Sequence, residues 1–272
     1  MSVTSEHSEH PVVLTIAGFD PSGGAGVIAD VRTFVHFGCR PTAAITSLTF
    51  QNSQGVFGAI HESARSLRAQ ILPIIEEYKV AAVKIGMLPT AELVSEVVAL
   101  INEKQLPAPV VDPVMQSSSG QRLIEQDATE TFVRELLPLA CLITPNIPEA
   151  ETLSGVRIED ELTMRHAAQK LREMGARAVL IKGGHQRRES GVRGQGSEEN
   201  AREAVDVFDE QGQVTIFRGG WSDAQPMRGT GCILSSAIAA VLARGANLKD
   251  AIAAAKQFVA AEIQNSKLGT HN

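Results

Sequence analysis

The stretch "VVLTIAGFDPSGGAGVIADVRTFVHF", residues 12–37, decides the fold class. It begins with an apolar run typical of a buried strand, passes through a glycine-rich turn and ends in a segment with helical periodicity. The same order recurs along the chain. Strands are expected at 12–18, 42–50, 80–87, 108–114, 141–145 and 178–184, and helices at 24–37, 63–77, 90–104, 126–138, 161–174, 231–244 and 248–265. Repeated strand–helix units whose strands are apolar on both faces predict a layered α/β fold with a parallel sheet.

Composition restricts the class of protein. The 272 residues suffice for one large domain, expected at 12–268 after a polar tail at 1–11. A net charge of −6 argues against a nucleic-acid surface as the main function. Three cysteines without close pairing or zinc-ligand spacing are typical of the reduced cytosol. No secretory signal and no apolar run of about 18 residues is present, so we expect a cytoplasmic protein that does not enter membranes.

Two late segments depart from the strand–helix pattern. Residues 186–204 combine high charge with three glycines and predict a mobile surface loop. The following segment has two β-rich runs flanking Gln211 and Gly212, which predicts a hairpin at the edge of the sheet.

Polar residues and glycines gather where the predicted strands end. Ligands of parallel sheets bind beyond the carboxyl ends of the strands, so these residues are expected to meet at one site. They are Asp20, Gly23, Gly24, Gln51, Asn52, Gly86, Met87, Asp112, Asn146, Lys182, Gly183 and Gly184.

The segment from Met227 to Cys232, "MRGTGC", leads directly into an alanine-rich helix. Two glycines before a helix N-terminus predict an anion site, because the first helical amides have no internal partner. Cys232 falls on the first turn, where the helix dipole is expected to lower the pKa of its thiol. The alternative is a capped helix with an inert core cysteine.

Two more segments have both a binding and a packing interpretation. In residues 17–30 a tight glycine turn leads into a helix, with Asp30 about two turns inside it, and this turn either packs closely against a ligand or only connects a strand to a helix. The carboxamide of Gln51 offers a donor and an acceptor to a heteroaromatic edge, or is satisfied locally at the strand end.

The run "TPNIPEAE", residues 144–151, places Glu149 in the first turn of a short helix that opens at Pro148. Glu149 either complements the helix dipole or, together with Lys182 and the anion turn, organises a hydrated Mg²⁺. Asp112 is the candidate second carboxylate, with a turn cap as its alternative. No P-loop, dinucleotide fingerprint or G-x-S-x-G hydrolase elbow occurs in the chain.

Seven motifs in order carry a resemblance to a known family. They are "TIAGFDPSGGAGVIADVRTF", "ITSLTFQNSQGV", "VKIGMLPT", "VVDPVM", "LITPNIPEAE", "IKGGH" and "RGTGCILSSAIAA". Together, over about residues 12–265, they resemble the hydroxymethylpyrimidine/phosphomethylpyrimidine kinases of thiamine biosynthesis, in the ribokinase-like superfamily. The resemblance implies a three-layer α/β/α sandwich with a central, mostly parallel sheet, and a homodimer. It also implies that ATP and Mg²⁺ are used to phosphorylate 4-amino-5-hydroxymethyl-2-methylpyrimidine and then its monophosphate.

The resemblance also implies roles for individual residues. Gln51 matches the glutamine that binds the aminopyrimidine edge. Asn146 and Glu149 match a motif for Mg²⁺ and phosphate placement, and Lys182 lies in the segment that approaches the ATP phosphates. Cys232 stands where the sugar kinases of the superfamily have an aspartate base, which makes it a candidate general base. The remaining implied site residues are Asp30, Gly18 and Met87 around the substrate and Gly229, Thr230 and Gly231 in the anion turn.

Two positions depart from the family pattern. Phe50 stands where alanine is common, and either narrows the substrate pocket or enters the core. Arg228 stands where histidine is common, and adds a cation near the transferred phosphate. A pyridoxal or pyridoxine kinase of the same superfamily is the alternative function, and a non-catalytic ligand-binding homologue is a further one.

Overall fold

A computed structural model describes residues 10–52, 54–117, 120–184, 203–220 and 229–267. Its nine strands form one sheet in the order β3-β2-β1-β4-β5-β6-β7-β8-β9. The five pairings from β2 through β7 by way of β1 are parallel, whereas β2–β3, β7–β8 and β8–β9 are antiparallel. The strands are β1 Val12–Phe19, β2 Arg40–Asn52, β3 Gly55–His61, β4 Val80–Ile85, β5 Val110–Val111, β6 Leu142–Ile143, β7 Ala178–Ile181, β8 Glu203–Glu210 and β9 Gln213–Gly220. The predicted mostly parallel sheet is confirmed.

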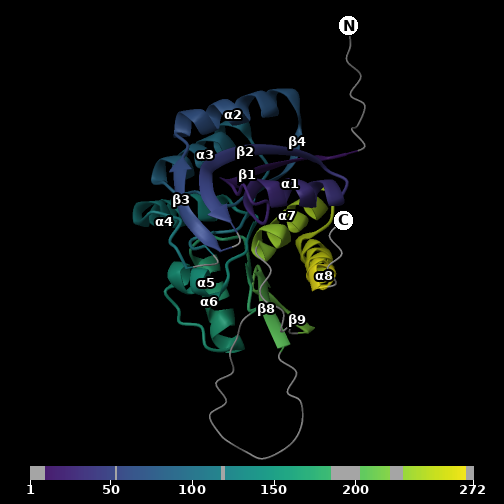
Figure 1. The fold of residues 1–272 in the computed structure, drawn as a ribbon. Helices are drawn as coiled ribbons and strands as arrows, with labels where there is room; N and C mark the ends of the chain where they lie inside the picture. Colours follow the sequence, from purple (N-terminus) through teal and green to yellow (C-terminus); the bar gives the residue numbers. More distant parts are fainter. Residues whose placement is uncertain (1–9, 53, 118–119, 185–202, 221–228, 268–272) are drawn as a thin grey trace, which may run out of the picture.

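Helices cover both faces of this sheet (Figure 1). They are α1 Gly26–His36, α2 Ala64–Glu77, α3 Ala91–Lys104, α4 Gln126–Thr131, α5 Ile147–Ser154, α6 Glu161–Glu173, α7 Thr230–Ala243 and α8 Leu248–Lys267. The segment predicted as one helix at 126–138 is α4 followed by a π-helical turn, Phe132–Leu136, and a 3₁₀ turn, Leu137–Leu139.

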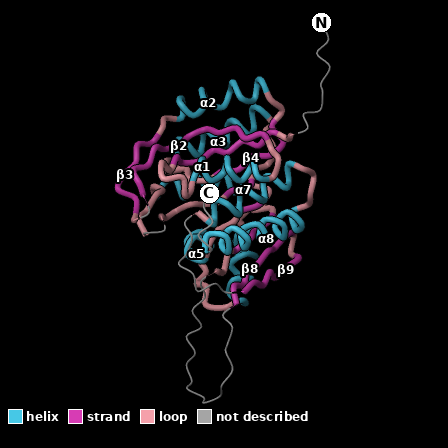
Figure 2. Tube along the Cα trace, turned by 45° about the vertical axis from the view of Figure 1, so that its right-hand side comes forward, coloured by secondary structure: helices cyan, strands magenta, loops and turns pink. Residues whose placement is uncertain are grey.

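The alternation of side chains along β1 separates two cores. Leu14 and Ile16 pack with α2, α3, α5 and α6 on one face, while Val13 packs with α1, α7 and α8 on the other. Helices α7 and α8 lie together on this second face (Figure 2). Because successive side chains of a strand point to opposite faces, an apolar run fills both cores at once, which gives the three layers.

The structure corrects several predicted strands. β3 was missed, because Gly55 and Gly58 weaken its apolar alternation. β5 and β6 have two residues each, since the chain leaves the sheet at Asp112 and Thr144 toward the site described below. β5 and β6 therefore end just before the polar residues Asp112 and Thr144.

The predicted hairpin is confirmed at the edge of the sheet. Gln211 and Gly212 join β8 to β9. Their φ angles of 53° and 85° are both positive, as in the two-residue hairpin turns whose twist matches that of the paired strands. Most of the predicted loop at 186–204 lies outside the described residues, but residues 203 and 204 already belong to β8. The loop prediction was therefore too long at its end.

Candidate active site

One cavity of about 630 Å³ lies at the carboxyl ends of the parallel strands, beside the start of α7. Segments far apart in the sequence line it, as the sheet topology requires. Of the residues predicted for the site, it is lined by Gly18, Gln51, Met87, Asp112, Asn146, Glu149, Lys182, Gly229, Thr230, Gly231 and Cys232. Gly86 and Gly184 line it as well, whereas the remaining residues predicted for this site do not; these are Asp20, Gly23, Gly24, Asp30, Asn52 and Gly183.

The turn before α7 requires glycine. Gly229 precedes the helix with φ 77°, and a Cβ atom placed on it would lie 2.0 Å from the carbonyl oxygen of Gly24. The two glycine-rich segments of the sequence therefore touch each other here. Because the first amides of a helix lack intrahelical partners, the start of α7 presents donors and a positive dipole to the cavity. Met227 and Arg228 lie outside the described residues, so the predicted cation at 228 is not tested.

Lys182 is the cation beside this helix start. Its Nζ donates to Asp112 Oδ1 at 2.7 Å, and a Cβ atom on Gly231 would lie 3.1 Å from that Nζ. Burial alone would lower the pKa of Lys182, but its acidic neighbours Asp112 and Glu149 together outweigh burial and raise it. The ammonium therefore stays charged where α7 begins. The Thr144 hydroxyl donates to the same Asp112 oxygen, Oδ1, at 3.2 Å.

Asn146 and Glu149 form a capping box at the start of α5. Asn146 Oδ1 accepts from the Glu149 amide at 2.9 Å, and Glu149 Oε2 accepts from the Asn146 amide at 2.8 Å. The helix-start interpretation of this motif is therefore correct. A backbone bridge also places Asn146 beside Lys182, and both Asn146 and Glu149 line the cavity.

The donor set fits Mg²⁺. Glu149 and Asp112 are hard oxygen donors at the same cavity as Lys182 and the helix start. Across the described ranges, no cluster of three or more His, Cys, Asp or Glu side chains is arranged as a metal site. Mg²⁺ needs no such cluster, because it binds through one or two carboxylates together with phosphate oxygens and water.

Glu149 is buried, and its burial has a consequence for stability. Desolvation raises its pKa to about 7, although Lys182 opposes the shift. The folded protein therefore binds more protons than the unfolded chain between the ordinary pKa of Glu149 and about 7, so the contribution of Glu149 to stability falls as pH rises through this window. Above pH 7 the folded, ligand-free protein carries a costly charge at this position.

Replacing Glu149 with glutamine is expected to stabilise the ligand-free protein by about 1–3 kcal/mol at pH 8, because the amide keeps an acceptor for the Asn146 amide without the buried charge. At pH 5 the gain is expected to shrink toward zero. Chemical denaturation at both pH values measures the difference. The matched control is Glu151→Gln on the same helix, whose half-buried side chain accepts a hydrogen bond from the Ile158 amide. A gain that is equal at pH 5 and pH 8 would contradict the assigned cause.

Cys232 does not behave as its helix position predicts. Burial raises the pKa of the Cys232 thiol to about 11, Lys84 opposes this, and the carboxylates of Asp112 and Asp30 add to it. The prediction of a lowered pKa was wrong because desolvation of the thiolate outweighs the helix dipole at this half-buried position in the cavity wall. In the ligand-free protein the thiol is therefore protonated at neutral pH.

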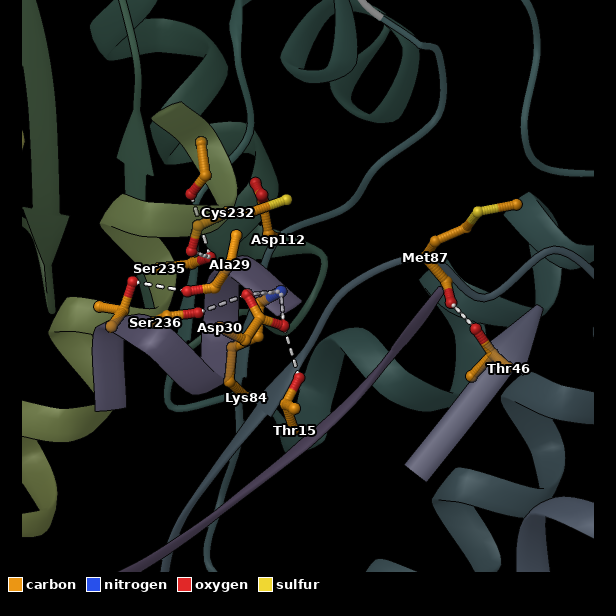
Figure 3. Close-up of polar contacts among 12 residues, drawn as sticks. Thr15, Ala29, Asp30, Thr46, Lys84, Met87, Asp112, Cys232, Ser235 and Ser236 are labelled. Atoms are coloured by element: carbon orange, nitrogen blue, oxygen red, sulfur yellow. Dashed lines mark hydrogen bonds and ion pairs between the residues drawn. The ribbon is translucent and has the colours of Figure 1, made fainter. Parts of the chain in front are cut away.

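Asp30 lies behind the wall of the cavity instead of lining it. Its carboxylate is fully buried and accepts from the hydroxyls of Thr15 and Ser236 and from the ammonium of Lys84 (Figure 3). The prediction that Asp30 lines the substrate pocket is therefore corrected, since these groups take up its oxygens. Lys84 was missed, although a lysine inside the apolar strand run "VAAVKIGM" was a usable signal.

The opposite wall of the cavity is flat and mostly apolar. Met87 packs against Gly18, where an added Cβ would lie 3.2 Å from the Met87 sulfur, and Thr46 holds the Met87 carbonyl with a 2.7 Å hydrogen bond. Gln51 lines the same wall, and its amide nitrogen donates to the Thr49 hydroxyl at 2.7 Å. The wall therefore suits a small aromatic ring with a polar edge.

Phe50 takes neither of its predicted places. Strand alternation turns it away from Thr49 and Gln51, and its side chain is 49% exposed over Gly58 of β3. It neither narrows the cavity nor enters the core.

The chain is similar to proteins of one known family over most of its length. The sequence model of the family described as phosphomethylpyrimidine kinase matches residues 20–272. The hydroxymethylpyrimidine/phosphomethylpyrimidine kinase of Aquifex aeolicus is 38% identical over 256 residues, 94% of this chain and 95% of the relative. The crystal structure of phosphomethylpyrimidine kinase from Clostridium difficile 630 superimposes with a TM-score of 0.78 at 35% identity, covering 93% of this chain and 99% of the other.

A second solved relative has a different name. Pyridoxal kinase of Bacillus subtilis, crystallised as an ADP complex, matches with a TM-score of 0.79 at 34% identity and covers 92% of this chain and 90% of its own. The shared fold is the ribokinase-like three-layer sandwich. The family match over nearly the whole described chain, together with the relatives at this level of identity, decides the assignment: the chain belongs to the phosphomethylpyrimidine kinase family.

Proposed function

We propose that the chain transfers a phosphoryl group from ATP to the hydroxymethyl group of 4-amino-5-hydroxymethyl-2-methylpyrimidine and then to the resulting monophosphate, in thiamine biosynthesis. One observation carries the proposal. A single cavity contains both a wall at Gln51 and Met87 that suits an aromatic ring, called the ring wall below, and a phosphate-binding end at Lys182 and the start of α7. A kinase requires such a joint site, because phosphoryl transfer depends on in-line positioning and on neutralising charge.

The phosphate-binding end supplies the charge neutralisation. The ammonium of Lys182 and the first amides of α7 are placed to contact the transferred phosphate, and Asp112 keeps Lys182 in place. Bound Mg²⁺ would neutralise charge on the ATP phosphates, with Glu149 and Asp112 as the residues that hold it. The capping box with Asn146 fixes the Glu149 carboxylate before any ligand arrives.

Cys232 is the proposed acceptor of the substrate hydroxyl proton. It lines the cavity from the first turn of α7, where the hydroxymethyl oxygen must approach the transferred phosphate. Because its thiol has a pKa of about 11, the basic form is scarce at neutral pH, and the reaction is expected to accelerate in the alkaline range.

A pyridoxal kinase is the second candidate function, favoured by the likeness to the Bacillus subtilis enzyme. Pyridoxal also carries a hydroxymethyl group on a nitrogen heteroaromatic ring, but its ring has no amino edge for Gln51. A coupled assay of ADP release with each acceptor decides between the two. We expect turnover with the pyrimidine and about tenfold lower kcat/KM with pyridoxal, since a hydrogen bond that pyridoxal cannot make to Gln51 is worth on the order of 1 kcal/mol.

The same assay separates the remaining alternatives. Turnover of pyridoxal alone would replace the proposed substrate, and ligand binding without ADP release from either acceptor would indicate a non-catalytic homologue. The alcohol and its monophosphate are supplied separately, so that each phosphorylation step is measured by itself.

The assembly of the protein also belongs to this proposal. Four large apolar side chains, Leu48, Phe50, Phe57 and Ile60, are exposed on the hairpin of β2 and β3. Leu48 pairs directly with Ile60, so these two share one face of the sheet. Exposed apolar side chains gathered on one hairpin support the expected homodimer. No helix in the described ranges is long and apolar enough to cross a membrane, and the cytoplasmic location stays a prediction.

A further inference from the structure

A fully buried ion pair lies directly behind the cavity. Lys84 Nζ donates to both carboxylate oxygens of Asp30, at 3.0 and 2.8 Å, and both side chains have no exposed surface. The two residues are 54 positions apart and come from β4 and α1. Neither residue has so far been given a role in binding a ligand or in catalysis.

The network around the pair fixes it rigidly. Thr15 of β1 donates to Asp30 Oδ2 at 2.6 Å, and Ser236 of α7 donates to Asp30 Oδ1 at 2.6 Å (Figure 3). Four elements are thus tied to one carboxylate. Ser236 is one turn beyond Cys232 on α7, so the network also connects the ion pair to the helix that begins at the phosphate-binding end.

The positive partner is the one that faces the cavity. Lys84 is among the residues that line it, and Asp30 is not. The absence of a side chain at Gly86 leaves room for the Lys84 ammonium, since a Cβ atom on Gly86 would lie 2.9 Å from Lys84 Nζ and 3.1 Å from Ala17 Cβ. The ammonium therefore lies against Gly86, the residue before Met87 of the ring wall.

Stability gives no reason for a charge at this position. Removing two charges from water costs several kcal/mol each, and apolar replacements of buried ion pairs are often neutral or stabilising. Burial would lower the pKa of Lys84, but its negative neighbours, Asp30 first, together outweigh burial and hold it above its ordinary value. The protein thus keeps a permanent positive charge next to the ring wall.

The distribution of charge in the cavity suggests a use for it. Among the described residues that line the cavity, Lys84 and Lys182 are the only lysines or arginines. Lys182 is paired with Asp112 at the phosphate-binding end, whereas Lys84 is paired with Asp30 and lies against Gly86, the residue before Met87. Two phosphorylation steps require two kinds of acceptor, first a neutral alcohol and then a phosphate monoester with about two negative charges.

We propose that Lys84, held by Asp30, is the charge that lets the acceptor side of the cavity bind the phosphate monoester in addition to the neutral alcohol. The inference rests on the proposed function and deepens it by assigning a residue to the second acceptor. Lys84 acts through space across Gly86, as a positioning charge, and contacts no reacting atom.

Equilibrium binding without ATP tests this directly. Calorimetry measures the affinities of the pyrimidine alcohol and of its monophosphate for the wild type, Lys84→Met and Asp30→Asn. Lys84→Met is expected to weaken monophosphate binding by at least about tenfold and alcohol binding by less than about threefold. Asp30→Asn removes the opposing charge and is expected to leave monophosphate binding equal to that of the wild type or tighter.

The two variants change the charge in opposite directions, so their effects on monophosphate binding distinguish an electrostatic role of Lys84 from a structural one. A merely structural role predicts that both variants weaken both ligands alike, and that result overturns the proposal. If Lys84→Met alone does not fold, the double variant Lys84→Met with Asp30→Asn removes both charges and must show the same selective loss of the monophosphate.

A matched control removes an ion pair elsewhere. Arg172 and Asp209 form a pair at 2.8 Å away from the cavity, and Arg172→Met with Asp209→Asn is expected to leave both affinities unchanged. A wild type that binds neither ligand overturns the proposed function, and the inference with it. A wild type that binds both, with variants that lose both equally, overturns the inference alone.

Discussion

Cys232→Ser is expected to lower kcat by about 10²–10³-fold with the KM for the pyrimidine within about threefold, because general-base assistance typically contributes this much to proton transfer. The serine side chain keeps the size of the cavity but does not ionise in the accessible pH range. Steady-state kinetics with saturating ATP measure both constants.

The pH dependence distinguishes this role from simple packing. A thiol whose pKa is raised to about 11 is increasingly deprotonated above neutral pH, so wild-type kcat is expected to rise with pH from 7 toward the alkaline limit. The serine variant should lack that rise. Unchanged turnover together with an unchanged pH profile would remove Cys232 from the chemistry.

The chain supplies a control with a similar thiol. Burial also raises the pKa of Cys141 to about 11, and Cys141 lies beside β6, outside the residues that line the cavity. Cys141→Ser is therefore expected to leave kcat and its pH profile unchanged, which isolates the effect of position from the effect of losing a thiol.

Gly229→Ala is the second substitution with a large expected effect. Alanine at φ 77° costs about 1–2 kcal/mol, and its Cβ would lie 2.0 Å from the Gly24 carbonyl, so the start of α7 must move. Because the phosphate-binding amides move with it, we expect kcat/KM to fall by about 100-fold or more. Thermal unfolding and kinetics on the same preparation measure the two effects.

Gly245→Ala is the matched control for backbone strain. Gly245 has φ 93° at the end of α7, but no described atom lies within 4 Å of an added Cβ. This variant is expected to lose about 1–2 kcal/mol of stability with unchanged kcat/KM. If both glycine variants lose activity equally, general destabilisation accounts for the loss and the specific role of Gly229 is contradicted.

Much of the fold and of the site was predictable because its signals are local. Apolar runs, glycine turns and helical periodicity each occupy one short segment, and their repetition implies the layers. The gathering of Gln51, Asp112, Glu149 and Lys182 followed from one topological rule, that parallel strands present their carboxyl ends to a common edge. The fold class and most of the residues that line the cavity could therefore be predicted from the sequence.

The remainder depends on packing between distant segments. The pKa of Cys232 is set by its enclosure beside Lys84 and Asp112, which no local helix pattern reports. The resemblance implied a place for Asp30 on the cavity wall, but the structure pairs Asp30 with Lys84. The two residues lie 54 positions apart in the sequence, and only the assembled layers bring them together. β3 was missed because an edge strand with glycines needs its neighbour to define it.

A crystal structure with the pyrimidine alcohol, Mg²⁺ and a non-hydrolysable ATP analogue tests the central claim most directly. The account predicts the aminopyrimidine edge at Gln51, the hydroxymethyl oxygen within hydrogen-bond reach of Cys232, and the terminal phosphate between that oxygen and Lys182 at the start of α7. A hydroxymethyl group turned away from Cys232, or a terminal phosphate bound away from the start of α7, would contradict it.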